Sequence, residues 1–177
     1  MSDVDTIQME VGEWAEENFG TEQPSSYPLL GAGEEIGELI HSVLKQKQGI
    51  RLDEEDVGTE SEKDAVGDIG VYLLDFLYRE GFALNTASPI REHTDGIVDE
   101  YDNEVEIIGE LYVTYARLWT EYPNYREDSS LQYVVMMFVL LDVFCEMRDG
   151  INSFKECLEL AWYGEVQERE WDADVEV

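Results

Sequence analysis

Four acidic residues stand at helical spacing in the first half of the sequence. Glu35 and Glu38 are three residues apart, and Asp64 and Asp68 are four apart on the next stretch with helical periodicity. Residues at these spacings share one face of a helix, so two antiparallel helices would bring the pairs together. Carboxylate oxygens are the ligands that Mg²⁺ prefers. The spacing indicates a magnesium site, with Mn²⁺ as an alternative ion, or else a solvated helix face in a chain rich in acids.

Basic residues cluster between the two acidic pairs. Four of the chain's 11 bases lie there, namely Lys45, Lys47, Arg51 and Lys63. In a chain that otherwise carries few positive charges, this clustering favours an anionic ligand such as a triphosphate. Local charge balance around acidic helices is the alternative explanation.

The overall charge is strongly negative. The 177 residues include 42 acids against 11 bases, a net charge of −31. Such a surface repels itself at low ionic strength, and molar salt removes the repulsion by shortening the Debye length to about 3 Å. We therefore expect a protein suited to concentrated salt, with an acidic mimic of nucleic acid as the alternative. Binding to a nucleic-acid backbone is not expected, because that requires clustered Lys and Arg.

Membrane and disulfide classes are disfavoured. The longest apolar stretch, Val134–Leu141, is far shorter than the roughly 20 residues that span a bilayer. The acidic start lacks the features of a signal peptide, so we expect a cytoplasmic protein without membrane association. Cys145 and Cys157 are the only cysteines. They are too few for a disulfide framework or a Cys-rich zinc site, and we expect both in the core.

Apolar periodicity predicts an all-α fold in a single domain, 1–177. We expect Gly49 to end the second helix, and Ser153 with Glu156 to form a capping box at the start of the last. The expected helices cover residues 5–19, 30–48, 62–80, 99–121, 129–149 and 153–169.

A weak internal repeat divides the chain. Glu34–Leu39 is echoed by Glu106–Leu111, and Leu73–Phe76 by Leu140–Val143. Two amphipathic hairpins can look alike by chance, or a duplicated half can keep its packing and lose its site. We expect 5–84 to be the catalytic half, 85–150 an additional hairpin packed on it within one chain, and 151–171 a C-terminal helix. Glu110 and Asp142 should then contribute no metal ligands.

Six short segments follow one another around the acids, and they read VGEW, NFG, LLG, EEIGEL, QGIR and KDAVGDI, in that order. This ordered set resembles the MazG-like family of all-α nucleoside triphosphate pyrophosphatases. The resemblance is good over 11–82, looser over Glu156–Trp171, and leaves 85–150 unaccounted for. The family's mark is ExxE on one helix and ExxD on the next, which together hold Mg²⁺ in a helical bundle. Single-repeat members pair chains, which implies that a homo-oligomer is compatible with this chain.

The resemblance assigns the metal ligands residue by residue. Glu35 and Glu38 match ExxE, and Asp68 matches the last acid of ExxD. The first acid of ExxD falls on Ala65, and Asp64, one residue earlier, is the expected substitute.

The resemblance also implies a reaction, hydrolysis between the α- and β-phosphates of an NTP or dNTP to give the monophosphate and pyrophosphate. Glu34, Glu35 and Glu38 would be the catalytic acids, with Glu34 in a second shell or on a second metal. Tyr72 would touch the sugar or a phosphate. The cations Lys45, Lys47 and Arg51 would hold the leaving pyrophosphate.

Aromatic residues could wall a base pocket. Trp14, Phe19 and Tyr72 are the candidates, although aromatic residues at helical spacing are more often plain core, and this is the favoured expectation for Trp14. The alternative function is a degenerate MazG-like protein that binds a nucleotide or a partner without turnover, and Ala65 is the residue that favours it.

Overall fold

Helices form the regular structure of the computed structural model, which describes residues 4–51, 56–84, 101–122, 127–167 and 169, with only the backbone for 127–130. No strand occurs in these ranges, so the predicted all-α class is confirmed. None of the helices described is long and apolar enough to cross a membrane. The elements are α1 (Val4–Phe19), α2 (Ser26–Gln48), α3 (Thr59–Arg79), α5 (Glu104–Glu121), α6 (Glu127–Met147), α7 (Phe154–Ala161) and the π-helical turn η2 (Trp162–Val166).

Several helix ends follow local signals in the sequence. Gly49 ends α2 in the left-handed conformation, with φ of 67°, as predicted. The Ser153 hydroxyl accepts a hydrogen bond of 3.2 Å from the Glu156 amide, which confirms the predicted N-cap of α7. Tyr122 is extended, with ψ of 133°, and ends α5 directly before a proline.

Other boundaries differ from the prediction. The helix α2 begins at Ser26 instead of Leu30, because Pro28 falls in the first turn, where its missing N–H has no partner to lose. The start of α5 at residue 99 was wrong within the described range, since Asn103 caps the helix by accepting from the Val105 amide at 3.0 Å. The last helix is not continuous to 169: it changes to a π turn after Ala161.

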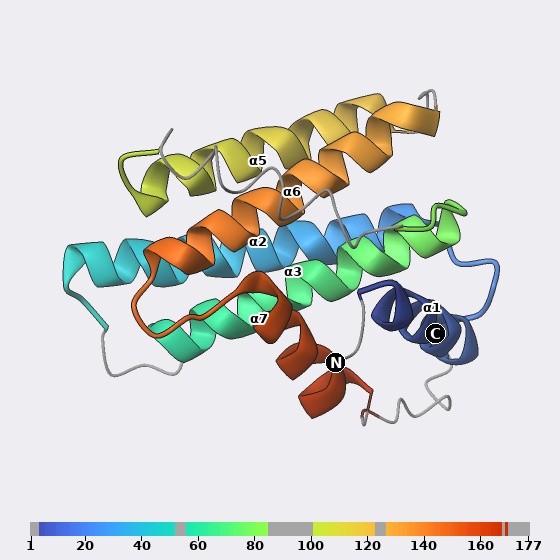
Figure 1. The fold of residues 1–177 in the computed structure, drawn as a ribbon, viewed down its shortest axis with the longest axis horizontal. Helices are drawn as coiled ribbons and strands as arrows, with labels where there is room; N and C mark the ends of the chain where they lie inside the picture. Colours follow the sequence, from blue (N-terminus) through green and yellow to red (C-terminus); the bar gives the residue numbers. More distant parts are fainter. Residues whose placement is uncertain (1–3, 52–55, 85–100, 123–126, 168, 170–177) are drawn as a thin grey trace.

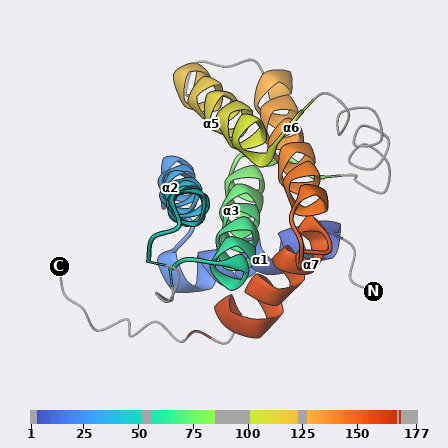
Figure 2. The same cartoon turned by 90° about the vertical axis from the view of Figure 1, so that its left-hand side faces the viewer.

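Two antiparallel helix pairs are layered on one another. Figure 1 shows α5 and α6 above the pair α2 and α3, with α1 and α7 on the opposite side of α3. The end-on view in Figure 2 places α3 at the centre, between α2, α6, α7 and α1. This central position explains why most of α3 is buried, including every residue from Leu73 to Leu77.

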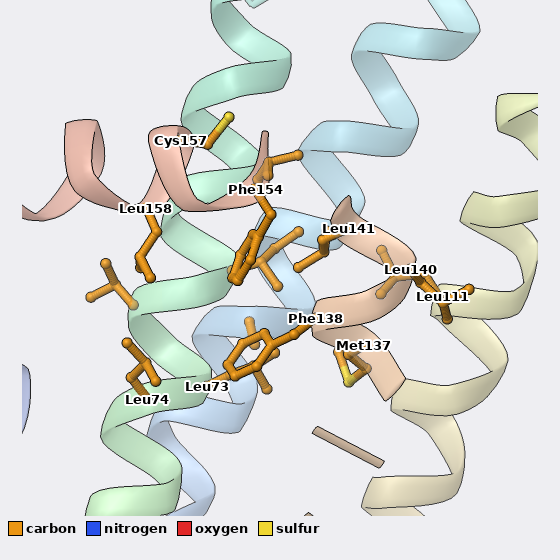
Figure 3. Close-up of a cluster of buried hydrophobic side chains, with 14 of the residues drawn as sticks. Leu73, Leu74, Leu111, Met137, Phe138, Leu140, Leu141, Phe154, Cys157 and Leu158 are labelled. Atoms are coloured by element: carbon orange, nitrogen blue, oxygen red, sulfur yellow. The ribbon is translucent and has the colours of Figure 1, made fainter. Parts of the chain in front are cut away.

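One continuous core joins the two pairs, and Figure 3 shows its central part. Leu73 of α3 and Phe138 of α6 are both fully buried. Phe138 stacks on Phe154 of α7 with ring centroids 5.0 Å apart. Tyr115 of α5 also donates to the Leu29 carbonyl of α2 at 2.9 Å, so the contact expected between 99–150 and the first hairpin is present in the described residues. Burial of these side chains is the main stabilising term between the layers.

A polar network also links the layers. Glu62 of α3 is completely buried, and its carboxylate accepts from Nε and Nη2 of Arg148 at 2.8 and 2.7 Å. Gln46 of α2 donates to the same carboxylate and accepts from Arg148 at 2.9 Å. Arg148 also contacts Glu104 at the start of α5, at 3.2 Å. Three helices and the residue directly after α6 thus meet at one satisfied ion pair. Elsewhere, Cys145 and Cys157 are free and buried, as predicted.

Candidate functional site

The hairpin of α2 and α3 brings the predicted metal ligands together. Burial is the main cause that raises the pKa of Glu35 to about 8, followed by the charge of Asp68 and then of Glu38, Glu34 and Asp64. The four other carboxylates are therefore each close enough to repel Glu35. Glu35 is half-buried at the centre of the group, whereas Glu34, Glu38 and Asp64 are exposed around it.

Asp68 faces the same group from α3. Burial raises its pKa to about 6, and the charges of Asp64, Glu165 and Glu38 act in the same direction. The charge of Arg169 opposes them. The four predicted ligands thus form one electrostatically coupled set, drawn from two helices.

The chemistry of this donor set fits a divalent cation. Its members are hard oxygen donors, and their crowding carries a repulsion that a cation would relieve. Within the described residues, no group of three or more His, Cys, Asp or Glu side chains already has the geometry of a metal site. Glu38 and Asp64 are exposed, so their side chains are not held by packing in the present rotamers.

Ala65 occupies the position where the resemblance predicts an acid. Ala65 is buried, with 2% exposure, within the core of the bundle. Asp64 is exposed, and its charge is one of those that raise the pKa of Glu35 and of Asp68. The structure therefore places a carboxylate at Asp64 beside the other acids.

A pocket adjoins the acids. It lies between α1, α3 and the segment that follows α7, and its volume is about 120 Å³. Asp68 lines this pocket and also belongs to the acidic group, so the pocket and the acids are adjacent. The lining residues are Val11, Trp14, Ala15, Phe19, Asp68, Val71, Tyr72, Asp75, Val166 and Arg169.

The three predicted aromatic residues all line this pocket. Trp14 is half-buried. Its ring forms T-shaped contacts with Phe19 and Trp162, with ring centroids 5.6 and 6.0 Å apart. It packs on the core and also lines the cavity, and its contact with a base stays a prediction. Burial raises the pKa of Tyr72, and the charges of Glu35 and Asp68 raise it further. The Tyr72 hydroxyl therefore lies beside the acids.

Gly31 allows α2 to approach Tyr72. A Cβ atom at Gly31 would stand 2.4 Å from the Tyr72 ring, a distance that no real contact shows. The glycine in the LLG segment therefore sets how closely the ring is covered, and any larger residue would push the ring toward the acids or the helices apart.

The predicted cations are dispersed. Lys47 lies on the side of α2 that faces α5 and pairs with Glu104 at 2.8 Å. Lys63 pairs with Glu60 at 2.8 Å. Lys45 shares the face of Glu38, about 10 Å further along α2. Arg51 is exposed just after α2, with a positive φ of 57°. The structure does not gather these four cations around the acids.

Sequence reasoning missed the cation that does lie beside the acids. Arg169 lines the pocket and lowers the pKa of both Asp64 and Asp68. It donates to Glu165 at 3.0 Å. The π turn, closed by a bond of 3.0 Å from the Gln167 amide to the Trp162 carbonyl, precedes it. Turns of this kind are frequent at functional sites, but periodicity does not reveal them.

Comparison with known proteins gives no relative: no family model, no curated protein and no solved structure matches this chain. A function for the site must follow from its own geometry.

Proposed function

We propose that this protein is a Mg²⁺-dependent nucleoside triphosphate pyrophosphohydrolase of the MazG-like type. It would add water across the α–β phosphoanhydride of an NTP or dNTP, and release the monophosphate and pyrophosphate. One observation carries the proposal: the carboxylates of Glu35, Glu38, Asp64 and Asp68 form a coupled group, and Asp68 also lines an aromatic pocket.

The four carboxylates would hold the metal, and the metal would supply the charge neutralisation that phosphoryl chemistry requires. No nucleophile from the chain is needed, because the reaction depends on positioning and electrostatics. Glu34, exposed beside Glu35, is placed to accept the proton of the attacking water.

The surroundings of the acids suit the rest of a nucleotide. The rings of Trp14, Phe19 and Tyr72 offer apolar faces on which a base can stack. Arg169 stands at the border between the pocket and the acids, where a phosphate group would lie. Lys45 lies on α2 seven residues after Glu38, on the same face of the helix. The exclusion of nucleic acid as a partner follows from the scarcity of such cations.

Turnover of a panel of NTPs and dNTPs, assayed in molar KCl with Mg²⁺ and with EDTA, tests the proposal. Release of pyrophosphate only with Mg²⁺ is the expected result. A protein that hydrolyses none of the panel under these conditions is not this enzyme.

A second candidate is a nucleotide-binding protein without turnover, and buried Ala65 favours it because one expected ligand is missing there. Equilibrium binding of a triphosphate without release of pyrophosphate would establish this alternative.

A further inference from the structure

Asp75 closes the far end of the aromatic pocket. It lies on α3 seven residues after Asp68, and both residues line the cavity. Seven residues of helix correspond to about 10 Å along the axis. That length is comparable with the reach of a nucleoside from its α-phosphate to the outer edge of its base. With the phosphates at Asp68, as the proposed function requires, the edge of the base comes to Asp75.

The Asp75 carboxylate has capacity to accept further hydrogen bonds. The residue is 7% exposed, and its Oδ1 accepts from Nε of Arg79 at 2.8 Å. Nη1 of Arg79 is directed elsewhere, to the carbonyls of Gly20 and Gln23 at 3.3 Å each. Nη2 of Arg79, the atom that would complete a two-pronged pair with Nε, has no hydrogen-bond partner in the described part of the chain, so Arg79 does not occupy both carboxylate oxygens. Among the described residues, none donates to Oδ2 of Asp75.

Asp75 is also an acceptor in the relevant charge state. Burial raises its pKa to about 6, against the opposing effect of Arg79. At neutral pH the carboxyl is mostly ionised, and an ionised carboxylate accepts hydrogen bonds but donates none. A buried acceptor of this kind is costly to leave without a donor, so it discriminates strongly between ligands that supply one and ligands that do not.

We propose that Asp75 determines base specificity, by accepting hydrogen bonds from a base that presents two adjacent N–H donors while the base stacks on the aromatic wall. Guanine has that edge, with N1–H beside the exocyclic amino group. Adenine and cytosine present a donor beside an acceptor, and uracil and thymine place their N–H between two carbonyls. Those acceptors would face the carboxylate and be repelled. The preferred substrate is therefore a guanine nucleotide.

Binding of nucleosides to the metal-free protein tests this inference without using turnover or phosphate. Guanosine, inosine, adenosine, cytidine and uridine would be titrated in concentrated NaCl, with tryptophan fluorescence and calorimetry as readouts. Inosine lacks only the amino group, so its affinity should be about tenfold below that of guanosine, the value of one such hydrogen bond. Equal affinity of guanosine and inosine would overturn the inference with no variant needed.

Asp75→Asn provides the second arm. The amide keeps the shape of the side chain but presents one acceptor and one donor, which matches adenine and cytosine. The affinity for guanosine should fall by about tenfold, and the affinity for adenosine or cytidine should rise relative to that for guanosine. A uniform loss for all nucleosides in a protein with an unchanged melting curve would show that Asp75 is only structural, and would contradict the inference.

Glu60→Gln is the matched control, because it removes one charge from the same helix at a side chain that is 88% exposed and outside the pocket. The two proposals can fail separately. Selective guanosine binding without hydrolysis would retain the base assignment and reject the enzyme. Hydrolysis of all triphosphates at equal kcat/KM would retain the enzyme and reject the base assignment.

Discussion

Arg169 lies beside Asp68, and its charge lowers the pKa that burial and neighbouring carboxylates raise. The segment after α7 thus returns to the acids of the first hairpin. It brings a cation beside the acids, where the sequence analysis expected Lys45, Lys47 and Arg51 instead.

Replacing this cation should weaken substrate binding more than the chemical step. We expect Arg169→Gln to raise KM for the triphosphate by about tenfold, with a small change in kcat, because one charge-assisted contact to phosphate is lost. Arg117→Gln, exposed on α5, is the control with the same charge change. An unchanged KM in steady-state assays at fixed KCl would exclude Arg169 from the site.

The metal-free protein should be more stable in mild acid than in mild base. The pKa values of Glu35, Asp68 and Asp75 are raised to about 8, 6 and 6, so the folded state binds protons more tightly than the unfolded state. Stability therefore falls as the pH rises from about 4 to about 8. Melting curves in EDTA at fixed KCl, between pH 5.5 and 8.5, measure this slope.

Glu35→Gln should flatten the upper part of that slope, between pH 6 and 8, because it removes the group with the highest pKa. Mg²⁺ should flatten it as well, since a bound cation favours the ionised carboxylates. A Tm that rises with pH across this window in EDTA would contradict the account.

Folding should depend on salt. A chain with net charge −31 repels itself at low ionic strength, and screening removes that repulsion. We expect Tm to rise steeply from dilute buffer to concentrated KCl at constant pH. Equal melting temperatures in the two solutions would refute the expectation of a salt-adapted protein.

The buried ion pair between the layers should be sensitive to the loss of one partner. Arg148→Met leaves the Glu62 carboxylate buried without its main donor, which typically costs about 3–5 kcal/mol of unfolding free energy. Glu62→Gln combined with Arg148→Met should recover much of that loss, because no charge is then left uncompensated. Guanidinium chloride melts of both variants measure the difference. A double variant that is less stable than Arg148→Met alone would contradict this role.

Local signals in the sequence predicted much of the fold. Helix periodicity, the left-handed Gly49 and the Ser153 cap act within a few residues, so they can be read from the chain. The acids of the site were predictable for the same reason, since Glu35 and Glu38 are neighbours on one helix. The aromatic pocket was anticipated only as a set of residues, without its shape.

Contacts between distant segments could not be predicted in this way. The pairing of Arg148 with Glu62, and of Arg79 with Asp75, depends on how helices are packed against each other. The π turn before Arg169 is not marked by helix periodicity, so an ordinary helix to 169 was expected. Lys47 was assigned to the substrate because it is near in sequence, but it lies on the opposite side of α2 from Glu38.

The acids themselves provide the strongest test. Glu38→Gln and Asp68→Asn each remove one ligand charge with little change in shape, so helix content by circular dichroism should be unchanged. Loss of a metal ligand should lower kcat by roughly 100-fold or more. Loss of a residue that only hydrogen-bonds to a metal ligand already lowers activity by up to about 100-fold. Glu110→Gln is the matched control, because Glu110 is the counterpart of Glu38 in the second hairpin and should leave activity unaffected.

The most direct measurement is the ratio of products from a guanine nucleoside triphosphate, and from the other triphosphates in parallel, in molar KCl. We expect one pyrophosphate for each monophosphate, no free phosphate, and dependence on Mg²⁺. Both products should be lost in Glu38→Gln and Asp68→Asn but not in Glu110→Gln. Release of free phosphate and a diphosphate, turnover in EDTA, or near-normal activity in either site variant would contradict these expectations.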